Sequence, residues 1–383
     1  MEPLSSPFNR QQFGALSRFC EVEVLATIPW FPAARAFRRW SSVARLVEVP
    51  EHESIDGLRV RHPRYVMLPK IGHAVAGPLY AASLAASMLR YRGRVDVVLG
   101  SWAYPDGFAA VVLADMLGVP AVIKLHGSDV NVVARWRGPR RLLKWALPRA
   151  ERVVAVSGAL AESAAALGVP AERIDLVPNG IDRASFRPRD RAEARAELGL
   201  PQGGKLVLYV GHISGPKGAF DLIQAFALVS RRVPDVRLVM VGDGSGLAEA
   251  QDMASGLSDR ITFVGAEPHD KIPSYLAACD LLALPSWNEG MPNVVLEALA
   301  SGRRVVATNV GGIPEVVTDE LGILVPPRNL ALLANALESA LATSYDPERI
   351  SAALERPDWD GSARLLFESL RSALGSRASR EAA

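Results

Sequence analysis

Residues 284–317, LPSWNEGMPNVVLEALASGRRVVATNVGGIPEVV, decide the fold and carry most of the chemistry of the chain. The pattern predicts the end of a strand, a loop, a helix, a second strand and a glycine turn that opens another helix. Glu289 lies in the loop, and Glu297 lies eight residues later, in the helix that Pro292 is expected to open. Proline suits the first helical position because its φ is already set and no amide donor is needed there.

The start of this helix is a candidate anion site. The backbone N–H groups of Met291, Asn293 and Val294 precede the first intrahelical hydrogen bonds, where orphan donors and the helix dipole favour a phosphate. Glu297 can only accept hydrogen bonds, as two ribose hydroxyls would require. The alternative interpretation is an ordinary α/β unit with two solvated glutamates.

The residues around the two glutamates favour the first interpretation. They resemble the large family of retaining, nucleotide-sugar-dependent glycosyltransferases of group 1 (family 4), which have two Rossmann-like domains facing a cleft, the GT-B architecture. The matching residues are Pro285, Ser286, Glu289, Gly290, Pro292, Leu296, Glu297, Ala298, Gly302, Gly311, Gly312, Pro314 and Glu315. The resemblance implies that Glu289 binds hydroxyls of the donor sugar, beside Gly290, and that Glu297 binds the ribose.

The composition indicates a globular chain. Its 383 residues, 49% hydrophobic and 22% charged, are enough for two domains with a core each. No apolar run reaches the ~20 residues of a membrane span, and the start has no signal-peptide pattern. Cys20 and Cys279 fit buried thiols in a reducing compartment, and the six histidines show no metal-ligand spacing. We expect a cytoplasmic enzyme without a structural metal.

The net charge of +2 conceals an asymmetry between the two halves. Residues 1–180 hold 22 Lys and Arg against 15 Asp and Glu, which leaves 21 and 26 of the totals of 43 and 41 for the remainder. The basic first half is therefore the candidate to meet an anionic partner.

The first half is expected to form a doubly wound parallel sheet. Residues 9–19 read as a helix, residues 21–27 as a strand, and residues 95–100 and 121–125 as buried strands separated by a helix over 107–117. A Rossmann-like domain normally opens with a strand and a glycine-rich turn, which have no counterpart here. Either the sheet lacks a central strand or the true start lies upstream, and we favour the second explanation.

Residues His126, Gly127, Ser128 and Asp129 follow the strand over 121–125, at the sheet edge where ligands of such folds bind. On position alone, His126 could equally be an ordinary loop histidine. The tetrad resembles the H-G-x-D loop of the family. The resemblance implies that His126 lies near the transferred sugar as a catalytic residue, that Gly127 is a backbone donor, and that Asp129 helps to bind the donor.

Residues 135–152, RWRGPRRLLKWALPRAER, interleave basic residues with tryptophan and leucine. One interpretation is a surface helix whose apolar stripe packs on the sheet. The other is a basic amphipathic surface for an anionic membrane or a lipid-pyrophosphate acceptor, which the basic and aromatic residues over 35–40 (Arg35, Phe37, Arg38, Arg39, Trp40) would extend. A nucleic-acid partner is not expected, because a pI of about 8.6 is modest and no nucleic-acid module is present.

The sequence around residues 176–182, LVPNGID, resembles the hinge signature of the family and ends the first domain. We predict an N-terminal acceptor-side domain over 1–182, a linker over 183–204, a nucleotide-sugar-binding domain over 205–358, and a C-terminal helix and tail over 359–383 that cross back to the first domain.

The second domain reopens with a strand and a glycine-containing turn over 211–218, GHISGPKG. In the family, an arginine and a lysine of this turn bind the donor phosphates. By this resemblance Lys217 stabilises the leaving diphosphate and Gly211 lies beside it, although a solvated lysine at a helix start is the simpler interpretation of Lys217 alone. His212 stands where the family has arginine, so donor binding would strengthen at acid pH.

Two further motifs are weak. The glycines over 242–246 are not followed by the acidic residue that an NAD site needs, so we reject a dinucleotide cofactor. Gly265 lies near the nucleobase by resemblance. Asp358 and Asp360 form a D-x-D motif just before the final helix, where helix capping is more plausible than a metal-bound nucleotide sugar.

The sequence thus predicts a metal-independent hexosyltransferase that uses a nucleotide-diphosphate sugar as co-substrate and needs no cofactor. A glycan or lipid-linked acceptor, retention of anomeric configuration and a role in surface polysaccharide biosynthesis at the inner membrane face are expected. The alternatives are an epimerase or phosphorylase, for which no carboxylate pair or cofactor lysine is found, and a sugar-nucleotide-binding protein that has lost catalysis.

Overall fold

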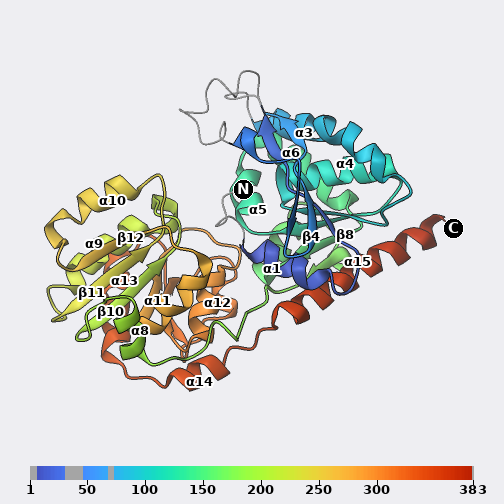
Figure 1. The fold of residues 1–383 in the computed structure, drawn as a ribbon. Coiled ribbons are helices and arrows are strands. Elements are labelled where there is room, and N and C mark those ends of the chain that lie inside the picture. The colour runs from blue at the N-terminus through green and yellow to red at the C-terminus, as the bar shows by residue number, and fades with distance from the viewer. Residues whose placement is uncertain (1–6, 31–45, 68–72, 382–383) are drawn as a thin grey trace. The chain divides into compact units, whose positions relative to one another are not determined.

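The computed structural model describes residues 7–30, 46–67 and 73–381 (Figure 1). The chain divides into two compact units, residues 1–180 with 359–383 and residues 181–358. The final helix therefore belongs to the first unit, as predicted. The predicted linker over 183–204 belongs to the second unit, because α8 (Arg191–Glu197) packs through Ala194 against α11 (Ile272–Ala278).

The second unit is an alternating α/β structure. Its remaining helices are α9 (Ala219–Val229), α10 (Leu247–Met253), α12 (Asn293–Ala300), α13 (Leu330–Ala342) and α14 (Pro347–Ala352). Its strands are β10 (Lys205–Val210), β11 (Val236–Val241), β12 (Ile261–Gly265), β13 (Leu281–Leu284), β14 (Arg304–Thr308) and β15 (Gly322–Val325).

These six strands form one parallel sheet in the order β12-β11-β10-β13-β14-β15. The chain builds outward from β10 in one direction and then restarts at β13 in the other, so the order reverses between β10 and β13. In open parallel sheets, ligands bind at this reversal, beyond the carboxyl ends of the strands. The loops that follow β10 and β13 are therefore the expected ligand loops.

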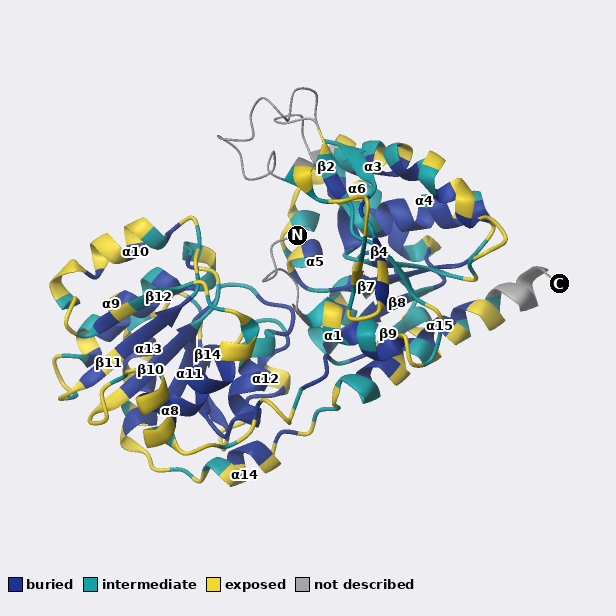
Figure 2. Ribbon diagram, in the orientation of Figure 1, coloured by how far each residue is buried: buried dark blue, intermediate teal, exposed yellow. Residues whose placement is uncertain are grey.

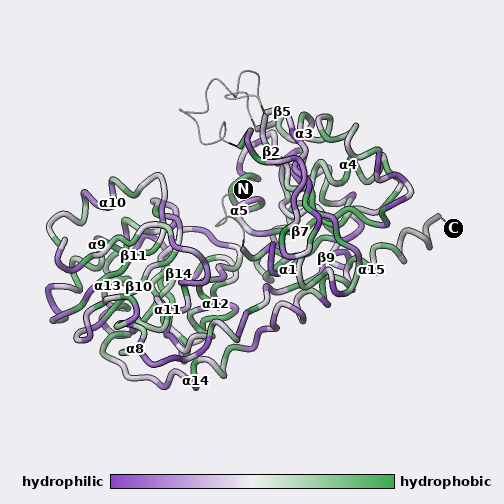
Figure 3. Tube along the Cα trace, viewed as in Figure 1, coloured by the Kyte–Doolittle hydropathy of each residue, from purple (hydrophilic) through white to green (hydrophobic). Residues whose placement is uncertain are grey.

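The sheet of the second unit is buried on both faces, which explains its continuous apolar strands. All residues of β13 and β14 are buried, and β10 and β11 expose only residues near their ends. Figure 2 shows β10, β11 and β14 largely dark blue and the outer faces of α8 and α10 yellow. In Figure 3 the same strands are largely green, as the apolar sequence requires.

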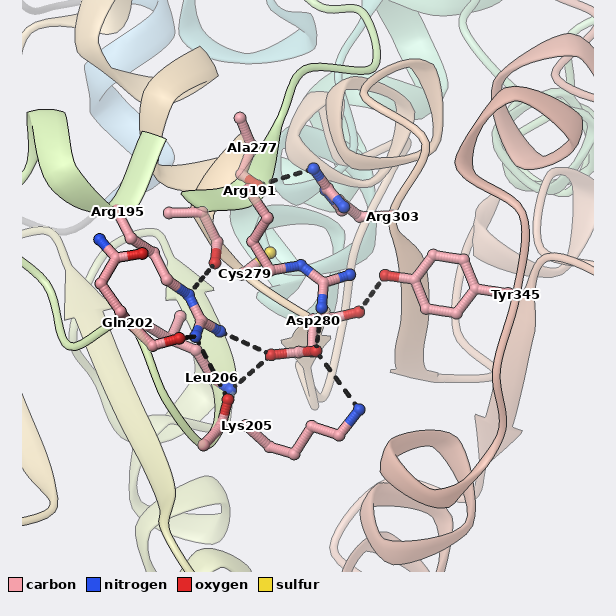
Figure 4. Close-up of polar contacts among 12 residues, drawn as sticks. Arg191, Arg195, Gln202, Lys205, Leu206, Ala277, Cys279, Asp280, Arg303 and Tyr345 are labelled. Carbon is pink, nitrogen blue, oxygen red and sulfur yellow. Dashed lines mark hydrogen bonds and ion pairs between the residues drawn. The ribbon is translucent and has the colours of Figure 1, made fainter. Parts of the chain in front are cut away.

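Asp280 fixes the amino ends of the central strands (Figure 4). Its buried carboxylate accepts hydrogen bonds from the Leu206 N–H at 2.8 Å, from Arg195 at 2.8 Å and from Arg191 at 2.6 Å, and Lys205 lies 3.6 Å away. Arg195 is itself buried and also donates to the carbonyl groups of Ala278, Pro201, Gln202 and Gly204. This network joins α8, β10 and the start of β13, at the sheet edge opposite the expected ligand loops.

The first unit also alternates helices and strands. Its helices are α1 (Pro7–Leu16), α3 (His73–Met88), α4 (Phe108–Leu117), α5 (Ser128–Asn131), α6 (Arg137–Ala146), α7 (Gly158–Ala165) and α15 (Trp359–Glu381). Its strands are β1 (Glu23–Leu25), β2 (Ile28–Trp30), β3 (His52–Ile55), β4 (Leu58–Arg61), β5 (Arg64–Val66), β6 (Val98–Ser101), β7 (Ala121–Leu125), β8 (Arg152–Ala155) and β9 (Ile174–Leu176).

The strands of the first unit fall into separate sheets. β6, β7, β8 and β9 form a parallel sheet in that order, while β1-β4-β3 and β2-β5 form small sheets of their own. Of the segment predicted as a strand over 21–27, only Glu23–Leu25 forms one, β1, and β2 begins just after the segment at Ile28. β1 pairs in parallel with β4, and β2 pairs in parallel with β5. Among the described residues, no ladder joins these small sheets to the four-stranded sheet.

Helix α15 packs against α1 and covers one side of the first unit's core. Leu366 and Leu370 of α15 lie with Leu16 of α1 and with Val122 and Val154 of the sheet in one buried cluster. The helix was expected to start just after the D-x-D motif but begins at Trp359, between its two aspartates. Asp360 therefore lies within the first turn, and it pairs with Arg18.

A buried polar chain lies beneath these helices. Lys124 of β7 donates to the Gln12 side chain, which donates to Ser362 of α15, whose hydroxyl in turn donates to the Pro178 carbonyl. Burial lowers the pKa of Lys124 to about 7, because a charged ammonium is poorly solvated there.

Candidate functional site

The loop after β10 forms one side of the candidate site in the second unit. It contains Gly211 and His212 and ends in a 3-10 helix, Gly215–Lys217. The Tyr209 hydroxyl donates to the His212 carbonyl at 2.9 Å and holds the turn. His212 is exposed, and Lys217 extends from the turn with 40% of its side chain exposed. An anionic ligand in solvent can therefore reach both side chains.

The loop after β13 forms the other side and is held between two glycine turns. Gly218 has φ +73°, and a Cβ there would collide with the Pro285 carbonyl. Gly311 has φ +55°, and a Cβ there would collide with the Glu289 carbonyl. Next to it, the Gly312 N–H donates to the Gly290 carbonyl at 2.7 Å. Glycine is required at both turns because any side chain would push the loop away.

An ion pair joins the two sides of this site. Lys217 Nζ lies 2.8 Å from Glu289 Oε1 and 2.9 Å from Oε2, which is a bidentate contact. The Glu289 side chain is only 9% exposed. Two residues predicted to act on the donor, from segments far apart in the sequence, are therefore in direct contact. A phosphate that binds Lys217 would replace Glu289 as the partner of the ammonium group. The Glu289 carboxylate would then be able to accept hydrogen bonds from hydroxyl groups.

Helix α12 follows this loop and presents its amino end on the same edge of the sheet. Met291 is buried, Pro292 is the N-cap and Asn293 is the first helical residue, so the prediction that Pro292 occupies the first helical position is wrong by one residue. Pro292 has an extended backbone, as an N-cap requires. The N–H groups of Asn293 and Val294 therefore point out of the helix start, where a phosphate is favoured.

Glu297 lies in the second turn of α12 and is nearly buried. Its Oε1 lies 2.8 Å from Nε2 of His269, a residue that follows β12 and Gly265 in the 3-10 helix His269–Lys271. The sequence analysis missed His269, because none of the motifs that it used includes this residue. The available signal was its position four residues after Gly265, in a turn opened by Pro268.

The predicted residues of the first unit lie in the loop after β7. His126 Nε2 is 3.0 Å from the Ser101 hydroxyl, and its ring stacks on Trp102 with 5.5 Å between centroids. Burial, and then the charge of Lys124, lower the pKa of His126 to about 3. The imidazole is therefore neutral at physiological pH, with one N–H donor and one acceptor nitrogen.

Asp129 is buried and organises this loop. Its carboxylate accepts backbone hydrogen bonds from Ala103 at 2.8 Å, Gly127 at 2.7 Å, His126 at 3.2 Å and Val130 at 3.1 Å. Burial raises its pKa, and these hydrogen bonds oppose that shift. Because no surface of Asp129 is exposed, the expectation that it binds the donor directly does not fit this conformation. Asp129 instead holds His126 and Gly127 in place.

Within the described part of the chain, no group of three or more His, Cys, Asp or Glu side chains could hold a metal ion. Over the same residues, no helix is long and apolar enough to cross a membrane. The basic and aromatic residues over 35–40 that were predicted to extend a basic surface lie outside the described residues.

Comparisons with known proteins agree with this geometry. A sequence model described as glycosyl transferases group 1 matches residues 190–356, and one described as glycosyltransferase family 4 matches residues 16–185. A Bacillus subtilis (strain 168) protein whose name assigns it to teichuronic acid biosynthesis as a glycosyltransferase, TuaC, is 31% identical over 91% of this chain and 87% of its own. The 2-deoxystreptamine glucosyltransferase of Streptomyces kanamyceticus is 32% identical over 75% of this chain and 80% of its own.

Solved structures show the same fold. HepE of Anabaena, crystallised in complex with UDP and glucose, has a TM-score of 0.73 at 22% identity and covers 96% of both chains. Sucrose-phosphate synthase of Thermosynechococcus elongatus has a TM-score of 0.70 at 23% identity and covers 98% of this chain and 92% of its own. The two α/β units have the GT-B fold, as the sequence predicts.

We predict that Gly311→Ala displaces the loop that carries Glu289. The strain of a left-handed alanine and the overlap with the Glu289 carbonyl should destabilise the second unit by about 2 kcal/mol or more. The measurement is the thermal midpoint of unfolding together with the rate of limited proteolysis within residues 285–294.

Gly256→Ala is the matched control, because a Cβ at Gly256 meets nothing within 4 Å. It should leave both quantities unchanged. Equal midpoints and equal cleavage rates for the two variants would show that the glycine turn does not hold the loop.

Proposed function

The chain belongs to the group 1 glycosyltransferases, and we propose that it transfers a hexose from a nucleoside-diphosphate sugar to a glycan or lipid-linked acceptor with retention of anomeric configuration. The observation that carries this proposal is the convergence of Lys217, Glu289 and Glu297 beyond the carboxyl ends of strands on both sides of the β10/β13 reversal. One cation and two carboxylates at such a place match a diphosphate that links a ribose to a sugar.

The donor would be bound by parts with distinct chemistry. Lys217, His212 and the amino end of α12 would hold the diphosphate, with Gly211 allowing its close approach. Glu297 would accept hydrogen bonds from the ribose hydroxyls, and Glu289 from the hydroxyls of the transferred sugar. The HepE structures described as complexes with UDP and with UDP-glucose support a nucleoside diphosphate as the ligand class.

Charge stabilisation would supply most of the catalysis. The bond from the anomeric carbon to the β-phosphate oxygen breaks, and negative charge develops on the diphosphate, where Lys217 and the helix start face it. The acceptor hydroxyl forms the new bond and gives its proton to the departing phosphate. Neutral His126 would donate a hydrogen bond to the transferred sugar without adding charge. This mechanism uses neither a metal ion nor a cofactor.

The proposed acceptor is a growing surface polysaccharide or its lipid-linked precursor. The name of TuaC places that relative in teichuronic acid biosynthesis. The first unit adds a basic helix, α6, whose Leu143 and Ala146 are buried while Arg140, Arg141 and Lys144 are exposed. Such a surface suits an anionic membrane at the cytoplasmic face.

The tryptophans of this region are only partly available to a membrane. Trp136 is 43% exposed and Trp145 is 37% exposed. Trp145 also packs on Phe108 at 5.5 Å between centroids and lies under the Arg149 guanidinium. The basic residues of α6 would therefore contribute more to membrane binding than Trp145.

A second candidate is a sugar-nucleotide-binding protein of the same fold that has lost catalysis. His212, in the position where the family has arginine, favours it. Turnover of any donor, including slow hydrolysis, separates the two candidates, because a binding protein forms no free sugar.

We predict that one of UDP, GDP and ADP binds the full chain with micromolar affinity. Lys217→Ala and Glu297→Ala should each weaken this affinity at least about tenfold, because each removes a charge-assisted contact. Isothermal titration calorimetry measures these affinities. Lys205→Ala serves as a control, because Lys205 carries the same charge in the same unit but lies at the opposite, amino edge of the sheet. Failure of all three nucleotides to bind would refute the proposed donor site.

We predict that the chain binds vesicles of phosphatidylcholine and phosphatidylglycerol, but not phosphatidylcholine alone. Triple charge reversal of Arg140, Arg141 and Lys144 to glutamate should abolish binding, and high salt should weaken it because exposed charges are screened. Co-sedimentation provides the measurement.

Reversal of three exposed arginines of the second unit, Arg187, Arg231 and Arg237, changes the net charge equally and should leave sedimentation intact. If the two triple variants sediment alike, helix α6 is not the membrane contact.

A further inference from the structure

We infer that His269 is a positioning residue that sets the Glu297 carboxylate for the ribose of the donor and makes nucleoside binding depend on pH. The inference rests on the proposed function, because it assigns the regulation of that same site. Neither the sequence motifs nor the comparisons assign a role to His269.

The contact is specific in its geometry. His269 Nε2 donates to Glu297 Oε1 at 2.8 Å, while the other carboxylate oxygen, Oε2, has its own lone pairs for the ribose hydroxyls. The His269 side chain is 26% exposed and that of Glu297 is 7% exposed. A carboxylate so deeply buried needs a donor or a cation close by to remain charged.

The histidine ring is itself held in place. Phe186, buried in the segment that follows the hinge, lies 5.4 Å from it between ring centroids. The 3-10 helix that carries His269 continues directly into α11, and α11 packs against α12, which carries Glu297. The ring and the carboxylate are therefore fixed by packed elements rather than by mobile side chains.

Three carboxylates face the His269 ring. They are Glu297 from α12, Asp182 from the end of the hinge segment over 176–182, and Asp270 from the same 3-10 helix. Burial opposes protonation of the ring, but the hydrogen bond and charge of Glu297, followed by the charges of Asp182 and Asp270, raise the pKa of His269 above its ordinary value.

The sign of the pH dependence follows from this shift. A raised pKa means that His269 keeps its proton to a higher pH than an ordinary histidine and loses it as the pH rises further. The imidazolium fixes Glu297 as a carboxylate with a charge-assisted hydrogen bond, whereas the neutral ring retains only an ordinary one. Ribose binding should therefore weaken as the pH rises through the pKa of His269.

The test compares UDP with inorganic pyrophosphate across pH, by calorimetry on the full chain; if GDP or ADP is the nucleotide that binds, it replaces UDP. Pyrophosphate lacks a ribose, so the ratio of the UDP affinity to the pyrophosphate affinity reports on the nucleoside part of the ligand. In the wild type this ratio should fall as the pH rises. His269→Gln keeps a hydrogen-bond donor without a charge, so its ratio should stay flat, at the level that the wild type reaches at high pH.

His269→Ala should weaken the binding of UDP about tenfold at neutral pH, because one charge-assisted hydrogen bond is lost. It should leave the affinity for pyrophosphate unchanged. If His269 acts through Glu297, His269→Ala should add nothing to the loss caused by Glu297→Gln in the double variant. His52→Ala is the matched control, because His52 is an exposed histidine of the first unit; it should change none of these values.

The inference is overturned if UDP binds the wild type and His269→Ala equally well at every pH. It is also overturned if His269→Ala weakens the binding of pyrophosphate as much as the binding of UDP. Additive losses in the double variant would also overturn it, because they would show that His269 acts independently of Glu297. If no nucleoside diphosphate binds the wild type, the proposed function fails and this inference fails with it. The two failures are therefore distinguishable.

Discussion

The carbonyl groups of Pro285 and Glu289 lie against two glycines, and the candidate site depends on this close packing. Gly218 and Gly311 both have positive φ, and neither position has room for a Cβ. The loop between them therefore cannot move outward or inward without breaking a turn. This constraint explains why Glu289 meets Lys217 with two short contacts although 72 residues of sequence separate them.

Close backbone packing lies at the carboxyl edge of the sheet, and a polar network lies at the amino edge. Asp280 joins α8, β10 and β13 at their amino ends, so the two strands on either side of the reversal start from a common fixed point. Because β10 and β13 are short and parallel, fixing their starts also fixes where their carboxyl ends present the two ligand loops. The network thus supports the site without contacting it.

The sequence predicted the parts of this fold that are set by local patterns. The strand Ala121–Leu125 was predicted to the residue, because a continuous apolar run bounded by turns leaves little choice, and the second strand expected within residues 284–317 is β14, Arg304–Thr308. The positions of Lys217 and Glu297 followed from glycine turns and helix starts. No comparable pattern predicted the contacts between distant segments.

Three features show where this limit lies. The contact of His269 with Glu297 requires α11 to return beside α12, and nothing local to His269 indicates that. The burial of Asp129 depends on the approach of the loop containing Ala103. The assignment of 183–204 as a linker failed because α8 packs through small alanines, which carry little hydrophobic signal.

The central claim is that the carboxyl edge of the sheet in the second unit binds a nucleoside diphosphate. Hydrogen–deuterium exchange of the full chain with and without a saturating nucleoside diphosphate tests it most directly. The account predicts that protection appears in residues 211–218 and 289–297 and leaves residues 190–205, at the amino edge, unchanged. Protection confined to residues 190–205, or to the first unit alone, would contradict it.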